Sequence, residues 1–357
     1  MEADKGSVTA VADRVFQAAL GAVDMLAIYL GDRLGWYRSL AEEGPANAAE
    51  LAARTETHPR YAREWLEQQA VTGLLTVHRD GNAAERVYAL PAATAEVLTD
   101  EHSLDYLAPI ARLFGATGPV LPKLLDAYRT GGGVSWDELG DDAREAQAAG
   151  NRPWYEHRLA DALNEVPELA RVLGAGGTRI LDVGCGAGWS AIALARAYPA
   201  ARVLGVDIDL PSVRMAVRHA AAAEVADRTE FMAGDAAELP AGGFDIAFAF
   251  ECVHDMPRPV EVLAAVRRAL RPGGFLVVMD EAVAPEFAPG GDELERLMYG
   301  FSLFVCLPDG MSSPPSAGTG TVLRPATLRG YAHEAGFTAF DVLPIEDFGF
   351  WRFYRLG

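Results

Sequence analysis

The stretch that decides the fold is TRILDVGCGAGWSAIALAR, residues 178–196. Its first part, 179–183, is a short apolar run of the kind that a buried parallel strand shows. Glycines then alternate at Gly184, Gly186 and Gly188, where the lack of a Cβ lets the backbone turn sharply and approach a bound molecule. The Ala- and Leu-rich segment that follows is typical of a helix, whose free N–H groups and positive dipole end face the loop. The stretch therefore predicts a strand, a nucleotide-binding loop and a helix.

The spacing of these glycines separates two kinds of nucleotide loop. A dinucleotide-binding loop has the pattern G-x-G-x-x-G. That pattern would need glycine at position 189, where this chain has Trp189. The chain instead has D-x-G-x-G-x-G, with Asp182 two residues before the first glycine. In this form the loop resembles the first motif of the class I S-adenosylmethionine-dependent methyltransferases. The resemblance implies S-adenosylmethionine as cofactor and S-adenosylhomocysteine as product.

After the loop, apolar runs alternate with helical segments, which predicts a parallel sheet flanked by helices. The expected further strands are 202–206, 229–233, 244–250, 275–281, 339–343 and 348–354. In members of the family that the chain resembles, a closing hairpin with an antiparallel last strand completes a seven-stranded sheet. The resemblance covers roughly residues 150–357. It implies an α/β fold with a Rossmann-like methyltransferase domain, which we place at residues 175–357.

Acidic residues at the ends of two expected strands match further motifs of this family. Asp207 ends the strand after the glycine loop, and an acidic side chain there accepts hydrogen bonds from the two ribose hydroxyls of a nucleoside. The resemblance implies that Asp235 bonds the adenine amino group, whereas Asp209 is expected to cap the next helix. The full predicted cofactor-binding set is Asp182, Gly184, Cys185, Gly186, Gly188, Asp207, Ile208, Gly234, Asp235, Ala236 and Glu251.

His254 and Asp255 follow the fourth expected strand, at the carboxyl edge where open α/β sheets bind ligands. A histidine with an ordinary pKa near 6.5 suits removal of a proton from a hydroxyl acceptor. In the O-methyltransferases that this chain resembles, a His-Asp or His-Asn pair here supplies the general base. We predict that His254 is the base, with Asp255 beside it, and that Asp280 or Glu281 orients its ring. The plant enzymes have a further acidic residue C-terminal to this pair, and the corresponding region of this chain, 318–325, contains none.

Two other acceptor atoms stay open. Some relatives methylate the carbon next to a keto group with the help of a metal, and a His-Asp pair followed by a distant histidine would support that chemistry. The later histidine of this sequence is His333, in the expected helix before the last hairpin, so no metal site is predicted. An amine acceptor needs less help from a base and is the other alternative.

Two segments are expected to line the acceptor pocket. The connector, 108–174, borders the cleft between two domains. The insertion, 282–324, is too long for a plain connection between a strand and a helix and is expected to cover the substrate. The predicted pocket residues are Trp154, Tyr155, His157, Met298, Tyr299 and Ser302. Alternatively, these apolar residues only pack and the histidine is solvated. The expected substrate is an apolar or aromatic small molecule with one polar acceptor.

Residues 1–107 are predicted to form a mostly helical winged-helix domain. Two short helices flank a turn at 55–59, and a hairpin of 74–78 and 86–90 forms the wing. Residues 45–90 hold five arginines and six acidic residues, which disfavours DNA binding, because a recognition helix should be basic. A ligand-sensing regulator is the alternative. A winged-helix module followed by a methyltransferase domain is the layout of small-molecule methyltransferases similar to the plant O-methyltransferases and their actinobacterial relatives.

The composition of the whole chain limits the remaining possibilities. At 357 residues it is long enough for two domains, and its net charge of −19 argues against a nucleic acid partner. The three cysteines have neither disulfide-framework nor zinc spacing. No signal-peptide pattern is visible, and Asp24 interrupts the longest apolar stretch, 18–30. We expect a cytoplasmic protein that binds no membrane. An apolar helix face within 11–34 either covers its own domain or packs against a second copy, and we expect a homodimer.

Overall fold

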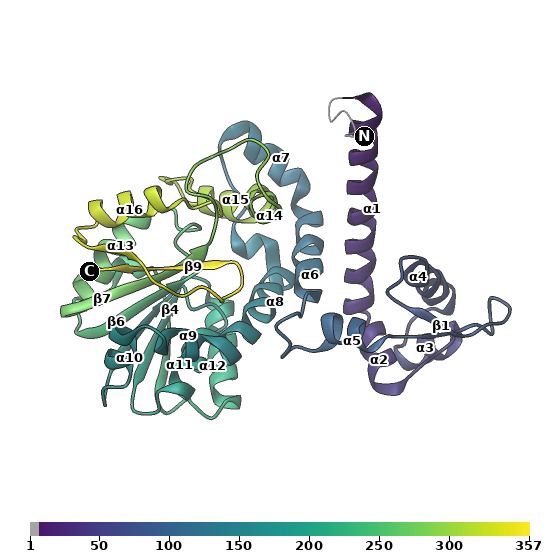
Figure 1. Ribbon diagram of the computed structural model, residues 1–357, viewed down its shortest axis with the longest axis horizontal. Coiled ribbons are helices and arrows are strands. Elements are labelled where there is room, and N and C mark those ends of the chain that lie inside the picture. Colours follow the sequence, from purple (N-terminus) through teal and green to yellow (C-terminus); the bar gives the residue numbers. More distant parts are fainter. Residues whose placement is uncertain (1–6) are drawn as a thin grey trace. The chain divides into compact units, whose positions relative to one another are not determined.

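The computed structural model describes residues 7–357, and the chain forms two compact units, Met1–Gly115 and Ala116–Gly357 (Figure 1). The N-terminal unit is helical with a small hairpin, whereas the C-terminal unit holds the large sheet. Residues 116–174 of the expected connector belong to the C-terminal unit.

The N-terminal unit has the predicted winged-helix architecture. Its elements are α1 (Val8–Arg33), α2 (Trp36–Glu43), α3 (Ala48–Arg54), α4 (Pro59–Val71), β1 (Thr76–Arg79), β2 (Val87–Ala89) and α5 (Ala92–Thr99), with α6 (Ala108–Thr117) at the boundary. A capping box starts α3, because Asn47 accepts the Glu50 N–H at 3.0 Å while the Glu50 carboxylate accepts the Asn47 N–H at 2.8 Å. Strands β1 and β2 pair antiparallel as the wing.

The C-terminal unit contains the predicted seven-stranded sheet, in the order β5-β4-β3-β6-β7-β9-β8. Its strands are β3 (Arg179–Val183), β4 (Arg202–Asp207), β5 (Thr229–Ala233), β6 (Phe244–Phe250), β7 (Leu270–Glu281), β8 (Phe340–Val342) and β9 (Trp351–Leu356). Strands β3 to β7 pair in parallel, and β9 pairs antiparallel with both β7 and β8. Strand β7 begins before its expected start at Phe275, because Leu270 pairs with Phe244 ahead of a register shift.

Both faces of the sheet are covered, as a parallel sheet requires. The helices of this unit are α7 (Leu121–Thr130), α8 (Trp136–Trp154), α9 (Ala160–Asn164), α10 (Pro167–Leu173), α11 (Trp189–Ala197), α12 (Leu210–Ala222), α13 (Pro259–Ala269), α14 (Glu293–Phe301), α15 (Leu307–Met311) and α16 (Pro325–Glu334). Helices α9 to α12 pack on the face that holds Ile180 and Phe248. Helices α13 and α16 pack on the opposite face, with Leu181 and Val278 (Figure 1).

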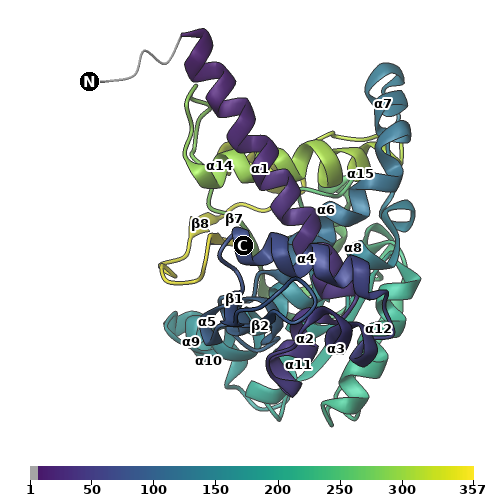
Figure 2. The same cartoon turned by 90° about the vertical axis from the view of Figure 1, so that its right-hand side faces the viewer.

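The insertion between β7 and α16 folds as α14, a π-helical turn (Ser302–Cys306) and α15. It is bonded to the segment between α7 and α8, and α15 lies beside α7 in both views (Figure 1 and Figure 2). The Val134 N–H donates to the Pro308 carbonyl at 2.9 Å, and the Trp136 N–H donates to Asp309 Oδ1 at 2.7 Å. A Cβ at Gly133 would lie 2.2 Å from the Pro308 oxygen, so the close approach requires glycine there.

Candidate active site

The glycine loop follows β3 and begins the site. Gly184, Gly186 and Gly188 have φ of 67°, 49° and 83°, so all three occupy the left-handed region that favours glycine. A Cβ at Gly184 would lie 2.6 Å from the Cβ of Cys252, which follows β6. The loop therefore packs directly against the segment that also carries His254.

Asp182, the last polar residue of β3, is buried beneath this loop. Its Oδ2 accepts a hydrogen bond from Ser190 at 2.6 Å, whereas Oδ1 has no hydrogen-bond partner among residues 7–357. Burial raises the pKa of Asp182 to about 7, because the charged form loses hydration. An unpaired buried carboxylate oxygen fits a ligand that brings a hydrogen-bond donor or a positive charge, as S-adenosylmethionine does.

The predicted ribose and adenine residues lie at the ends of the next two strands. Asp207 Oδ2 accepts the Gly186 N–H at 2.7 Å, and its Oδ1 accepts the Asp209 N–H at 2.8 Å. A carboxylate offers about four acceptor positions, so these two bonds hold the group and leave lone pairs for a ligand. The predicted cofactor residue Ile208, beside it, is 75% exposed at this edge of the sheet. Asp235 accepts from Arg258 at 2.6 Å.

Glu251 directly follows β6 and has a backbone conformation that is costly for a residue with a Cβ. Its φ of 50° is unusual for a residue with a Cβ and is enforced by its surroundings. Its carboxylate accepts hydrogen bonds from Trp351 of β9 and from Asn151 of α8. Burial raises the pKa of Glu251 to about 7, although the Trp351 hydrogen bond opposes that rise. The turn from β6 into the following loop is therefore fixed from two sides.

His254 lies in the loop after β6, enclosed by three carboxylates. Its side chain is 3% exposed, and Nδ1 is 2.9 Å from Asp280 Oδ1 and 3.3 Å from Glu281 Oε2. On the other side of the ring, Nε2 is 3.3 Å from Asp255 Oδ1. Burial lowers the pKa of His254, but Asp255, Asp280 and Glu281 outweigh it and raise that pKa well above its ordinary value. The surroundings therefore favour the imidazolium.

The three carboxylates differ in their access to solvent. Asp280 and Glu281, at the end of β7, are almost completely buried, and burial raises the pKa of Glu281 well above its ordinary range. The Asp255 side chain is 33% exposed and is thus the member of the group that reaches the surface. The order from the interior outward is Asp280, the His254 ring and Asp255. Such a row orients the ring and stabilises positive charge on it.

His254 also belongs to two sets of side chains with donor atoms that a metal ion could use. One set adds Asp255 and Cys306, the other adds Asp280 and Glu281, and in each the donor atoms lie within 4.8 Å of one another. Both sets need the imidazole that a general base would use, so metal binding and proton transfer by His254 are mutually exclusive roles.

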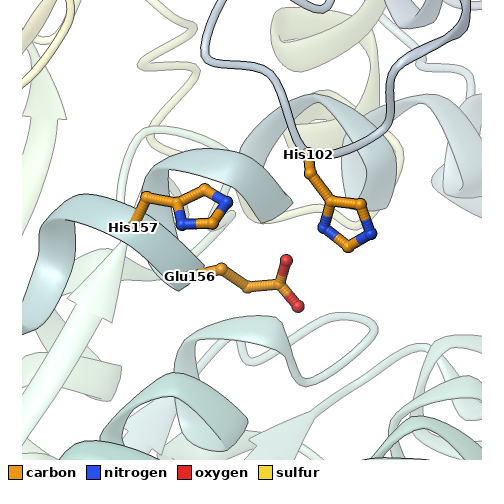
Figure 3. Close-up of side chains that lie close together, drawn as sticks. All are labelled: His102, Glu156 and His157. Carbon is orange, nitrogen blue, oxygen red and sulfur yellow. The ribbon is translucent and has the colours of Figure 1, made fainter.

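The predicted pocket residues have different surroundings. Trp154 packs on Phe348 and Trp351, with ring centroids 5.5 Å apart in each case. Tyr155 is buried with its ring centroid 5.6 Å from that of Phe250, whereas His157 is exposed. Figure 3 shows Glu156 and His157 on one helical turn of the C-terminal unit, and His102, which belongs to the N-terminal unit.

In the insertion, Met298 is buried, and the Tyr299 hydroxyl accepts from Arg324 at 3.3 Å. Ser302 is brought towards the histidine loop through Gly320. The Gly320 N–H donates to the His254 carbonyl at 3.2 Å, and a Cβ on Gly320 would meet Ser302 Oγ at 2.3 Å.

Several residues around the site were not anticipated from the sequence. On α8, Arg144, Gln147 and Asn151 recur at helical spacing and face the ends of β4 and β6 through Asp209 and Glu251. That spacing of polar residues was a usable signal. Trp351 had none, because only the folded sheet brings it near Glu251. Cys306 belongs to the insertion that is expected to cover the substrate, and the fold brings its thiol near His254.

Comparisons with known proteins agree with this architecture. Residues 180–274 match a family model described as a methyltransferase domain, and residues 21–100 match an Rv2258c-like winged HTH domain. The 27-O-demethylrifamycin SV methyltransferase of Amycolatopsis mediterranei is 40% identical over 33% of this chain and 43% of its own length, which is less than two thirds of that relative. The ubiquinone biosynthesis O-methyltransferase of Ralstonia nicotianae is 32% identical over 48% of this chain and 67% of its own length.

A solved structure, that of the mitomycin 7-O-methyltransferase MmcR, matches over 98% of both chains with a TM-score of 0.74 and 22% sequence identity, which shows a shared fold. The glycine loop, the seven-stranded sheet and these matches agree with one another. The chain therefore belongs to the class I S-adenosylmethionine-dependent methyltransferases, with a winged HTH domain preceding the methyltransferase domain.

Proposed function

We propose that this protein transfers a methyl group from S-adenosylmethionine to a hydroxyl of a small apolar or aromatic metabolite, with His254 as the general base. The observation that carries the proposal is the His254 ring between Asp280 and Asp255, in a loop that packs on the glycine loop. The cofactor, when bound, supplies a methyl group on a positively charged sulfur that a nucleophile can take.

The protein's own residues divide the remaining work. The glycine loop, Asp182, Asp207 and Asp235 hold the cofactor. A neutral His254 keeps its proton on Nδ1, where Asp280 Oδ1 accepts it, so the lone pair on Nε2, beside Asp255, takes the proton of the acceptor hydroxyl. Asp255 and the two buried carboxylates then stabilise the imidazolium. Alignment of acceptor and donor, rather than the proton transfer alone, supplies much of the acceleration of such a displacement.

Two further observations support the choice of acceptor. The relatives named above are an O-methyltransferase of ubiquinone biosynthesis, a 27-O-demethylrifamycin SV methyltransferase and a mitomycin 7-O-methyltransferase by their names, which favours oxygen. The insertion offers partly exposed apolar side chains at Tyr299, Leu303 and Phe304, which suit an apolar or aromatic substrate.

The experiment that tests this proposal is a transfer assay with S-adenosylmethionine carrying a deuterated methyl group. The enzyme is incubated with pooled small phenols, alcohols, amines and keto acids, and products are located by mass spectrometry. We expect the labelled methyl on oxygen of an apolar or aromatic acceptor. Label found on nitrogen or carbon would refute the hydroxyl assignment.

We also propose a cytoplasmic homodimer that forms through α1. The helix exposes a row of large apolar side chains, which are Val8, Val11, Val15, Phe16, Leu20, Val23, Leu26 and Leu30. By length and composition α1 could cross a membrane. However, the Trp65 indole N–H donates to the Ala27 carbonyl at 2.9 Å, and Arg112 pairs with Asp32. These bonds hold the second half of α1 within the N-terminal unit. They favour a second copy of the chain as the partner that covers the exposed apolar side chains of α1.

Substitution of Phe16 and Leu20 by glutamate should therefore yield a monomer without unfolding the protein. The two side chains are 62% and 44% exposed, so a charge there disrupts an interface but not the core. Sedimentation velocity at several concentrations measures the change, and circular dichroism controls for folding. A wild-type chain that stays monomeric throughout would contradict the dimer.

A DNA-binding role for the winged helix has little electrostatic support. On α4, Arg60 pairs with Glu64 and Arg63 pairs with Glu67. Arginines engaged in this way on the would-be recognition helix leave little positive charge for a phosphate backbone.

A further inference from the structure

Arg144 lies on α8, outside every motif discussed for the cofactor, yet it is one of the most strongly bonded side chains near the site. The residue is 6% exposed. Its Nε donates to Asp209 Oδ2 at 2.8 Å and one Nη donates to Asp209 Oδ1 at 2.9 Å, a two-pronged ion pair. The remaining donors reach Asp137 and Asp141, whose side chains are more than four-fifths exposed.

Asp209 connects this guanidinium to the cofactor edge. Its carboxylate also accepts the Ser212 N–H at 2.9 Å and so caps α12, as predicted. Its backbone N–H donates to Asp207 Oδ1 at 2.8 Å. Arg144 therefore fixes the side chain of Asp209, and the backbone of the same residue fixes the carboxylate of Asp207. Two successive hydrogen bonds therefore connect the Arg144 guanidinium to the Asp207 carboxylate, the group expected to bind the ribose.

The helix that carries Arg144 is itself held at both ends. Its first N–H, at Trp136, donates to Asp309 of α15, and near its other end Asn151 donates to Glu251. Within it, Gly140 has φ 78° and ψ −165°, a conformation that is essentially restricted to glycine. The interruption of α8 at Gly140 lets Asp137, before the glycine, form its hydrogen bond with Arg144, after the glycine. The placement of the guanidinium is thus defined by the fold and not by a flexible surface pair.

We propose that Arg144 is a positioning residue for the ribose of S-adenosylmethionine, acting through Asp209 on the Asp207 carboxylate. The inference rests on the proposed contact of Asp207 with the ribose hydroxyls. An arginine is needed because a lysine supplies a point charge without the planar pair of donors that matches a carboxylate. Loss of this pair frees the turn 207–212, and the Asp207 oxygens are then no longer presented in one orientation.

The test is calorimetric binding of S-adenosylhomocysteine and of its 2′-deoxy analogue, which lacks one ribose hydroxyl. Wild-type protein should prefer the full ribose by about tenfold or more, since hydrogen bonds to charged groups are strong. Arg144→Met should weaken binding of S-adenosylhomocysteine about tenfold and leave the analogue almost unchanged, so that the preference is lost. The affinity of Arg144→Lys for S-adenosylhomocysteine should lie between that of the wild type and that of Arg144→Met.

The matched control is Arg129→Met, which removes an arginine that is 70% exposed on α7 and should leave both affinities unchanged. Thermal unfolding checks each variant; if Arg144→Met does not fold, Arg144→Lys, which keeps the buried positive charge, decides the question. Asp207→Asn distinguishes the proposed contact of Asp207 with the ribose from the proposed positioning role of Arg144. If it keeps the preference for the full ribose, the ribose contact is wrong. If it loses the preference while folded Arg144 variants keep it, Arg144 has no positioning role.

Discussion

Replacement of His254 by alanine is expected to lower kcat by about 10²–10⁴-fold, the usual contribution of a positioned general base, while the cofactor Kd stays within about threefold. The ring contacts Asp255, Asp280 and Glu281, none of which belongs to the predicted cofactor-binding set. Steady-state methyl transfer under saturating substrates measures kcat, and calorimetry with S-adenosylhomocysteine measures binding.

Two controls make the His254 result specific. His333→Ala removes an exposed histidine of α16 and should leave kcat unchanged. Treatment of the wild-type protein with a chelator should also leave kcat unchanged, because the proposed base needs no metal. Turnover by His254→Ala close to that of the wild type would remove the base assignment. Activity lost to the chelator and restored by a divalent metal would assign the donor set around His254 to a metal instead.

Replacement of Asp207 by alanine is expected to weaken cofactor binding by about 10² to 10⁴-fold. Two hydrogen bonds to a charged acceptor are worth about 1.5–3 kcal/mol each, and each 1.4 kcal/mol is a factor of ten in Kd. The substitution also removes the acceptor of the Gly186 N–H, which loosens the glycine loop.

The measurement for Asp207 is calorimetric titration with S-adenosylhomocysteine at a concentration that detects weak binding. Asp227→Ala is the matched control, since its side chain is 75% exposed and it lies at the opposite end of the neighbouring strand, before β5. Binding by Asp207→Ala that stays within about threefold of wild type would show that the ribose does not depend on this carboxylate.

Much of the fold could be predicted because its signals are local. The runs at 229–233 and 244–250 form strands with those same bounds, since each is short and rich in apolar or β-branched residues. The cap at Asp209 was predictable for the same reason, because Pro211 and Ser212 follow it directly. The start of β7 was missed, because the pairing of Leu270 with Phe244 is made across the sheet.

The candidate site was predictable only in part. His254 and Asp280 stand out because His254 follows β6 and Asp280 lies at the end of β7, and these two strand ends meet at one edge of the sheet. The enclosure of the histidine by three carboxylates depends on side-chain packing between β6 and β7, which spacing along the chain does not encode. Arg144 and Trp351 act through partners about 65 and 100 residues away in the chain, so they become recognisable only in the folded structure.

The most direct test of the central claim is the pH dependence of kcat for a phenolic acceptor and its aromatic amine analogue. The carboxylates raise the pKa of His254 well above its ordinary 6.5, so most of the base is protonated at neutral pH. Transfer to the phenol should then rise about tenfold per pH unit until pH passes that raised pKa. The amine, whose nucleophilic form is already neutral, should lack this rise. A phenol profile that is flat across neutral pH, or that coincides with the amine profile, would contradict His254 as the base.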